Sequence, residues 1–307
     1  MEGIKIHRRI NVKGPVMLAA WPGMGNAALE AVDYLRKKME AIPFGEIDPN
    51  LFHAPEAVII EEGLARLPRQ TKNLFYFTRN PDLIIFKSES QLSGKPALKL
   101  VSQILDLAQK LGVRRIYTGA AFPSTMSYWE SSQVFGVVNK EPLRDFLVRS
   151  QVKIMERGQI SGLNGLIIGC AEERGIEAIC LLATLPSYAI NFPNPKASRA
   201  IVEVLGKILD VHVDMEELNI AVKGMDGKMA LIEDKIKSLF PAMVKGSELV
   251  NLEKEKVPDY VMDKIGKLFR EAKVDREKAY LLKEELDRWD LYKLYEDKFL
   301  DLFKDSQ

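Results

Sequence analysis

The segment Val16-Met-Leu-Ala-Ala-Trp-Pro-Gly-Met-Gly-Asn26 predicts the fold class of this chain. Its first five residues are apolar and follow Gly14-Pro15, as in a buried strand, and the two glycines after them indicate a tight turn. Asn26 is placed to cap a helix, because apolar residues recur at helical spacing from Leu29 to Met39. A strand, a glycine turn and a helix in this order are typical of α/β proteins.

The same alternation of strands and helices continues along the chain. Arg79-Asn-Pro-Asp82 separates two apolar runs and indicates a hairpin, and Gly112 and Gly175 each end a helical pattern. The expected strands cover 16–20, 56–61, 74–77, 83–86, 115–120, 133–138, 152–155 and 178–183, and the expected helices cover 95–111, 165–174 and 196–209. We therefore predict an α/β fold with a twisted, mostly parallel sheet between helices.

The last part of the chain has a different pattern. Beyond about residue 214 the strand signals disappear, and helical, heavily charged sequence follows, interrupted by Pro241 and Pro258. We predict an α/β domain over residues 1–220 and a C-terminal helical extension over 221–307. An aromatic and apolar stripe in the extension is typical of a core or an interface. We expect a partner interface at Leu286, Trp289, Tyr292, Tyr295 and Phe299.

Composition excludes several function classes. The 44 basic and 43 acidic residues give a formal net charge of +1, whereas a duplex-binding protein normally shows a basic excess that neutralises phosphates. Cys170 and Cys180 lie in apolar runs without a histidine nearby, so zinc-ligand spacing is missing. The three histidines lie outside any nucleophile motif, and no Gly-x-Ser-x-Gly elbow occurs. We therefore assign no catalytic residue, metal or other cofactor, and we expect no nucleic-acid partner.

The sequence also gives an expectation for location. The start, Met1-Glu-Gly-Ile-Lys-Ile6, lacks the apolar core of a signal peptide, and no stretch is long and apolar enough to span a bilayer. We therefore expect a cytoplasmic protein with no membrane partner.

Two glycine-rich loops are the first candidates for a binding site. One is the turn around Trp21, Gly23, Gly25 and Asn26, and the other is Ile160-Ser-Gly-Leu-Asn-Gly-Leu166, which also opens a helix. In the second loop, Ser161 or Asn164 is expected to cap the helix, and Gly162 and Gly165 allow close backbone approach. Helix starts of this kind bind anions, but the dinucleotide fingerprint has Ala28 at its third glycine and the phosphate-loop pattern is absent. The alternatives are an anion site and two turns that pack against each other.

Other candidates follow predicted strands. Glu61 stands at the end of an apolar strand, and Gly119 lies where we expect the run 115–120 to end as a strand in a glycine-containing loop. Tyr188 and Asn191 lie in the segment 186–195, after the most apolar strand, and we expect them to line the rim of a cleft.

Taken together, these segments resemble the proteasome assembly chaperone 2 family over about residues 10–220. The resemblance is carried, in order, by Trp21-Pro-Gly-Met-Gly25, Thr118-Gly-Ala120, Ile160-Ser-Gly-Leu-Asn-Gly-Leu166, Gly175-Ile-Glu-Ala-Ile-Cys-Leu-Leu-Ala-Thr184 and Pro193-Asn-Pro195. It implies a fold like that of the purine nucleoside phosphorylases and a homo-oligomer.

The resemblance also implies a protein-binding scaffold or chaperone that assists assembly of the proteasome or of another complex. Some family members dock through a C-terminal tail that ends in a hydrophobic residue, tyrosine and any residue, whereas this chain ends Asp305-Ser-Gln307 without that motif. The alternative is a small-molecule enzyme or ligand-binding protein of the nucleoside or nucleotide type. It would use the glycine loops as an anion site and Glu61 or Glu62 as acid or base.

Overall fold

The computed structural model describes residues 3–52 and 57–239, and after these 265, 267–269, 271–272, 277–288, 292, 295 and 299. The chain divides into two compact units, Met1–Pro241 and Ala242–Gln307. The boundary that we expected at residue 220 falls inside helix α6 (Glu216–Leu239), which belongs to the first unit. The assignment of separate roles to residues 1–220 and 221–307 stays a prediction.

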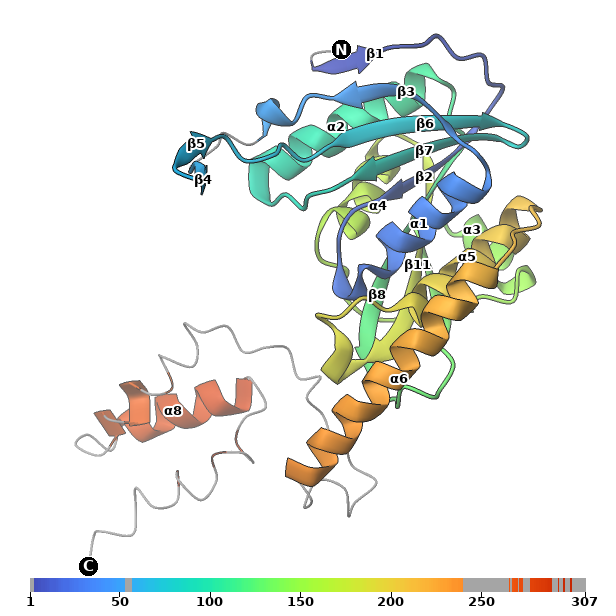
Figure 1. The fold of residues 1–307 in the computed structure, drawn as a ribbon. Coiled ribbons are helices and arrows are strands. Elements are labelled where there is room, and N and C mark those ends of the chain that lie inside the picture. The colour runs from blue at the N-terminus through green and yellow to red at the C-terminus, as the bar shows by residue number, and fades with distance from the viewer. Residues whose placement is uncertain are drawn as a thin grey trace, which may run out of the picture. The chain divides into compact units, whose positions relative to one another are not determined.

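A twisted sheet of nine described strands forms the centre of the first unit (Figure 1). Its strand order is β1-β3-β6-β7-β2-β8-β11-β9-β10. The strands are β1 (Ile4–Ile6), β2 (Val16–Ala20), β3 (Ile42–Ile47), β6 (Asn73–Arg79), β7 (Asp82–Ser88), β8 (Arg115–Ser124), β9 (Val134–Val138), β10 (Lys153–Ile154) and β11 (Glu177–Pro186).

The four central strands, β7, β2, β8 and β11, are mutually parallel. The β6–β7 hairpin that we expected is antiparallel, as are the pairs β1–β3, β3–β6 and β9–β11, so the sheet is mixed at its flanks. All five residues of β2 are buried, because a parallel strand in a sheet covered on both faces has no solvent side. The predicted α/β class is therefore confirmed.

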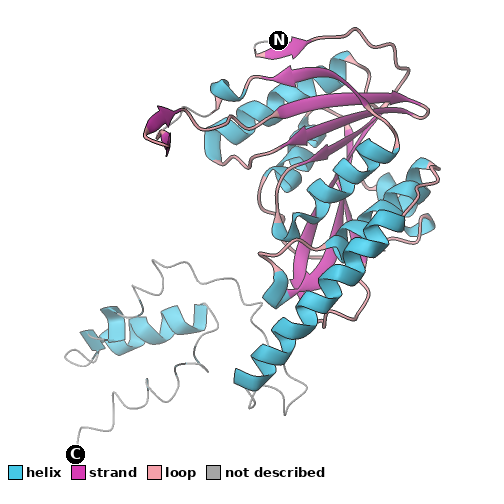
Figure 2. Ribbon diagram, viewed as in Figure 1, coloured by secondary structure: helices cyan, strands magenta, loops and turns pink. Residues whose placement is uncertain are grey.

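Helices cover both faces of this sheet (Figure 2). The helices that cover it are α1 (Ala27–Lys38), α2 (Gly94–Lys110), α3 (Pro142–Arg149), α4 (Leu163–Glu173) and α5 (Pro195–Leu209), and α6 packs on α5. Short 3-10 turns are η1 (Met24–Asn26), η2 (Pro49–Leu51) and η3 (Ser187–Ala189).

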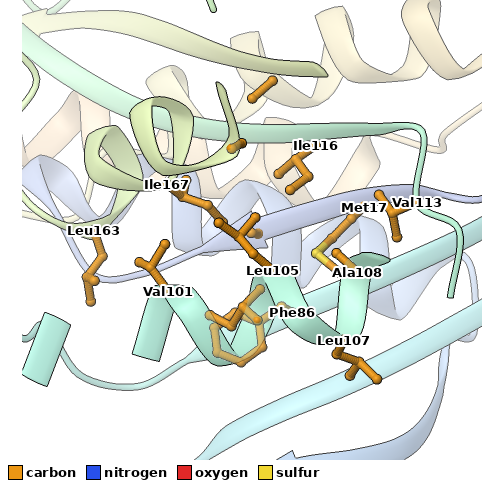
Figure 3. Packing of buried hydrophobic residues seen from close by; sticks show 14 of the residues in the cluster. Met17, Phe86, Val101, Leu105, Leu107, Ala108, Val113, Ile116, Leu163 and Ile167 are labelled. Carbon is orange, nitrogen blue, oxygen red and sulfur yellow. The ribbon is translucent and has the colours of Figure 1, made fainter. Parts of the chain in front are cut away.

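Each face has its own apolar cluster. On one face α2 and α4 pack over the sheet, and Figure 3 shows Val101 and Leu105 of α2 with Ile167 of α4 beside Met17 and Phe86 of the strands. On the other face, the second cluster joins α1, α3 and α5 to the alternate residues of the same strands. The sheet is thereby fixed from both sides.

Two predicted segments differ from the structure. The strand expected over 56–61 is not part of the main sheet: β4 (Ile59–Glu61) pairs with β5 (Leu64–Arg66) in a separate two-stranded sheet. Gly119 does not lie in a loop, because β8 continues through it to Ser124. Both errors arise because strand pairing, which is non-local, decides where an apolar run belongs and where a strand ends.

The second unit has a small core of its own around helix α8 (Glu277–Arg288). Its buried members are Ile265, Leu268, Phe269, Ala272, Ala279, Leu282, Leu286 and Phe299, with Tyr292 and Tyr295 packed against them. Of the predicted interface residues, Leu286 and Phe299 therefore serve this core, and Trp289 lies outside the described residues. An interface role for Tyr292 and Tyr295 stays a prediction. No helix among the described residues combines the length and the apolarity needed to cross a bilayer.

Candidate functional site

The carboxyl ends of the parallel strands meet at one edge of the sheet. The glycine turn 21–26 follows β2 there, and the loop 89–93 follows β7. Helix α4 also begins at this edge, since it runs back along the sheet to the start of β11. In open α/β sheets, ligands bind in the crevice outside the carboxyl ends of the strands.

Asn164 ties the two glycine loops together. Its Oδ1 accepts hydrogen bonds from the Trp21 backbone N–H (3.1 Å) and the Thr118 hydroxyl (3.3 Å), and its Nδ2 donates to the Trp21 carbonyl (3.2 Å). The expected capping role of Asn164 is wrong, because Gly162 occupies the N-cap position and Asn164 lies inside the first turn of α4. Asn164 is buried, so these bonds replace water for the backbone polar groups of Trp21.

Gln91, which the sequence analysis missed, makes a second link between the loops. Its Nε2 donates to the Pro22 carbonyl, and its Oε1 accepts from the Leu163 backbone N–H at 3.2 Å. Gly162 allows this approach: its φ is +81°, and a Cβ there would lie 3.3 Å from the Gln91 amide. A glutamine in a loop has no local signature for such a role, and only its position just after β7 points to the edge.

Gly25 joins the first turn to the segment after β11. Its N–H donates to the Ile190 carbonyl (2.9 Å), and its carbonyl accepts from the Asn194 N–H (2.8 Å). With φ at +59°, Gly25 leaves no room for a side chain, since a Cβ would lie 2.9 Å from atoms of Asn194 and Leu185. Asn194 then caps α5 by accepting from the Ala197 N–H (2.9 Å). These hydrogen bonds thus hold the turn 21–26, the segment after β11 and the start of α5 together at this edge.

Three backbone N–H groups bear on the two interpretations of the glycine loops. The backbone N–H groups of Gly25, Asn26 and Leu163 all donate to atoms of the chain itself. Asn26 adopts a left-handed conformation, with φ at +48°, and makes no side-chain cap bond, contrary to our expectation. Because these donors are already bonded, the geometry favours packed turns over an anion site at the loops.

A cleft of about 520 Å³ lies beside the joined loops. Its walls are apolar or neutral, from Pro22, Gly23, Met24, Ala28, Gln91, Leu92, Ser93, Ala120, Ala121, Phe122, Pro123, Gln159, Ile160, Ser161, Gly162, Asn164 and Leu182. Met24 is the most accessible large apolar side chain of this set, at 42% exposure. The cleft therefore suits an uncharged, largely apolar group.

Seven of the predicted binding residues belong to the two joined loops. Gly23, Gly162 and Asn164 line the cleft, whereas Trp21, Gly25, Asn26 and Gly165 support its walls. The Trp21 side chain is fully buried and packs against Phe86, with ring centroids 5.4 Å apart. Gly165 is required by packing, because a Cβ there would lie 2.4 Å from the Ile160 carbonyl oxygen.

The remaining candidates lie elsewhere. Glu61 is exposed on the separate β4–β5 hairpin, and Gly119 is buried in β8 beneath α1. Asn191 is exposed and lines no part of the cleft. The Tyr188 hydroxyl donates to Glu233 of α6, and burial together with this carboxylate raises the pKa of Tyr188. Tyr188 therefore fixes α6 to the edge of the sheet.

The described residues contain no cluster of three or more histidine, cysteine, aspartate or glutamate side chains that could hold a metal ion. Cys180 is fully buried, and burial raises the pKa of its thiol to about 12, so it stays protonated at neutral pH.

This chain is similar to one protein family and to several proteins of known structure. A model described as the PAC2 family matches residues 17–232. PbaB of Pyrococcus furiosus, described as an archaeal proteasome activator, is 24% identical with a TM-score of 0.65, covering 75% of this chain and 98% of that one. PbaA of the same organism, an archaeal homologue of proteasome-assembly chaperone, is 22% identical with a TM-score of 0.60, covering 77% and 99%. An uncharacterised protein of Methanocaldococcus jannaschii is 24% identical over 240 residues, which cover 77% of this chain and 88% of that protein.

Proposed function

This chain belongs to the PAC2 family, and from that premise we propose that it is a protein-binding scaffold or chaperone that assists the assembly of a larger complex. Proteasome subunits are the partner class that its structural relatives suggest, since PbaB and PbaA are described as a proteasome activator and an assembly-chaperone homologue. We further propose that it acts in the cytoplasm as a homo-oligomer.

The observation that carries this proposal is the neutral, largely apolar cleft at the carboxyl edge of the sheet. Protein-binding hot spots bury apolar anchors in well-packed pockets whose surroundings exclude water. Here the walls are held rigid by Asn164 and Gln91, so little conformational entropy is lost when an anchor enters. An apolar side chain of a partner is the group that we expect in the cleft.

A pair of matched variants tests this role. Met24→Lys places a charge in the cleft, and Phe192→Lys places the same charge outside it on a side chain of similar exposure, 44% against 42%. Purified wild type and both variants are mixed with recombinant proteasome α subunits of the source organism, and complex formation is followed by native electrophoresis and sedimentation. We expect Met24→Lys to weaken binding at least tenfold and Phe192→Lys to leave it unchanged.

Two results would count against the proposal. Equal binding by Met24→Lys and wild type would remove the cleft from partner recognition. Failure of the wild type to bind the α subunits would reject them as partners, and recovery of no partner with tagged wild type from native lysate would reject the scaffold role itself.

A small-molecule ligand is the second candidate, and the size of the cleft favours it. A volume of about 520 Å³ lies within the usual ~300–1,000 Å³ of ligand pockets. Because the cleft walls are neutral, we expect nucleosides to raise the melting temperature and charged nucleotides to do so less. A thermal-shift panel with wild type and Met24→Lys tests this, and no shift with any compound would reject it.

A further inference from the structure

A second cavity, of about 410 Å³, lies at the edge of the sheet opposite the cleft. Its wall includes Lys13 just before β2, Leu83 near the start of β7 and Arg114 just before β8, which places it at the amino ends of the parallel strands. The cavity and the cleft share no lining residue. A ligand at this edge would therefore be independent of the glycine loops.

The strand register brings polar and apolar side chains together beside this cavity. Val16 of β2 pairs with Leu83 of β7 and with Arg115 of β8. Arg115 in turn pairs with Glu177 of β11, and Tyr117 follows it two residues later on β8. Paired residues share a face and side chains alternate along a strand, so all five point to the face that α1, α3 and α5 cover.

Arg115 is held in a fixed orientation at the cavity. Its Nε and one terminal nitrogen lie 2.8 Å and 2.6 Å from Glu177 Oε2, and its other terminal nitrogen donates to the Tyr117 hydroxyl at 3.2 Å. The guanidinium also lies over the Phe146 ring, 4.5 Å from the ring centroid. A guanidinium has five N–H groups, so each terminal nitrogen carries a second N–H that these contacts do not use.

The Tyr117 hydroxyl is a further donor at the cavity. Tyr117 is only 2% exposed, and burial raises the pKa of its hydroxyl, so the proton is retained at neutral pH. Because a guanidinium only donates, the hydroxyl oxygen accepts from Arg115 and its own proton is free to bond elsewhere. No described residue accepts that proton. A buried donor of this kind suits a ligand that brings an acceptor.

The charges around the cavity favour an anion. Three side chains are basic and two are acidic, which leaves one positive charge uncompensated: Lys13, Arg114 and Arg115 against Asp82 and Glu177. Glu177 balances Arg115, whereas Arg114 is exposed and has no ion-pair partner among the described residues. The Arg114 charge also acts on the Tyr117 hydroxyl. Arginine forks match the geometry of a carboxylate, which can accept from several donors at once.

The other walls of the cavity are apolar. Phe146 of α3 and the last two residues of α5, Ile208 and Leu209, line it opposite the sheet. The last carbonyl groups of α5 would repel an anion, but two of them accept hydrogen bonds from the N–H groups of Asp210 and Val211. The volume lies within the usual ~300–1,000 Å³ of ligand pockets. The cavity therefore suits a molecule with an anionic head and an apolar body.

We propose that this cavity binds a small organic acid, with its carboxylate on Arg114, Arg115 and Tyr117 and its apolar body against α3 and the end of α5. The site lies apart from the cleft, so the chain can hold this ligand and a protein partner at the same time. Octanoate combines a carboxylate with an apolar chain and serves as the probe.

Isothermal titration calorimetry of the full chain tests the ligand class. Octanoate is compared with octanol, octylammonium and inorganic phosphate, which share either its apolar chain or its negative charge but not both. We expect octanoate to bind at least about tenfold more tightly than each of the others, because one charge-assisted hydrogen bond is worth about that factor.

Two variants test the carboxylate contacts. Arg114→Gln and Tyr117→Phe should each weaken octanoate binding about tenfold and leave octanol binding unchanged, whereas a general loss of structure would weaken both. Arg69→Gln removes an exposed arginine outside the cavity, and Tyr34→Phe removes the hydroxyl of another buried tyrosine on the same face. Both controls, and Met24→Lys in the cleft, should bind octanoate as the wild type does.

Several results would overturn the proposal. No saturable heat with octanoate would reject the site, and phosphate bound as tightly as octanoate would reject the organic acid as its ligand. Unchanged octanoate binding in both Arg114→Gln and Tyr117→Phe would place the ligand elsewhere. Loss of octanoate binding in Met24→Lys alone would place it in the cleft.

Discussion

Asn164 satisfies both backbone polar groups of Trp21 from a position 143 residues away. Replacing it by alanine leaves the Trp21 N–H and carbonyl buried without their partners. Such groups cost about 1–3 kcal/mol each, so we expect Asn164→Ala to lower the free energy of unfolding by roughly 3 kcal/mol. Urea unfolding followed by circular dichroism measures it. Asn191→Ala is the control, because Asn191 is exposed, and a similar loss in both variants would contradict the role of Asn164.

Asp33 gives a prediction on pH. It joins α1 to β7, since its Oδ1 lies 2.8 Å from both Arg36 Nε and Lys87 Nζ, and Lys37 lies 3.1 Å from Oδ2. Burial alone would raise the pKa of Asp33, but the hydrogen bonds from Arg36, Lys87 and Lys37 outweigh it and hold the pKa well below its usual range. The unfolded chain therefore binds this proton first, and the stability from Asp33 is present above about pH 4 and lost as the pH falls.

We expect Asp33→Asn to lower the free energy of unfolding at pH 7 by about 2 kcal/mol and to matter much less near pH 2. Urea midpoints of wild type and variant across this range give the comparison. Asp106→Asn is the control, since Asp106 pairs with Arg174 at an exposed site and should contribute less than about 1 kcal/mol. A difference between wild type and Asp33→Asn that stays constant with pH would reject the ionic role.

At the scale of elements, α1 lies very close to β8. A Cβ at Gly119 would be 3.0 Å from the Ala28 Cβ and 3.5 Å from Ile201 Cδ1 of α5, so the strand needs a glycine there for both helices to pack. Gly119→Val should therefore lower the free energy of unfolding by roughly 2–3 kcal/mol through overpacking, and Gly119→Ala by less.

A double-mutant cycle tests the contact between α1 and β8. Ala28→Gly should relieve part of the loss in Gly119→Ala, giving a coupling energy of at least about 0.5 kcal/mol. Gly169→Ala is the matched control, because a Cβ there meets no atom within 4 Å and helical Gly→Ala should stabilise by about 0.5–1 kcal/mol. Additive effects at positions 28 and 119 would contradict the close approach.

The elements that local pattern determines were predicted well. The β2-turn-α1 unit and the β6–β7 hairpin appear where apolar periodicity and turn residues placed them. Ile59–Glu61 was assigned to the wrong sheet, because a short apolar run does not reveal its pairing partner. At the site, the pattern gave the glycines but not the bonds of Asn164 and Gln91, since hydrogen bonds between distant segments leave no periodic signal.

At the scale of the whole molecule, the described contacts of α6 show that this helix is an integral part of the first unit. Val222 and Met229 of this helix are buried, Asp226 pairs with Lys196 at 2.9 Å, and Glu233 accepts from the Tyr128 N–H at 3.0 Å. A chain that ends after residue 220 loses all of these contacts, whereas one that ends after Pro241 keeps them.

We therefore expect the chain 1–241 to unfold cooperatively, with a urea midpoint close to that of the first unit within the full chain. The chain 1–220 should be less stable by roughly 3 kcal/mol or more, because two buried apolar side chains and their polar neighbours are removed. Urea unfolding of both chains at equal concentration makes the comparison. Equal midpoints would mean that α6 contributes nothing to the first unit.

The hydrogen bonds between Trp21 and Asn164 also affect the order in which the chain folds. Parts of the chain that are 143 residues apart must meet before either wall of the cleft is held, and such long loops close late in folding. During synthesis the first glycine turn leaves the ribosome well before the residues that brace it. A partner that recognises the finished cleft would thus ignore nascent chains and engage only molecules whose synthesis and folding have passed this point.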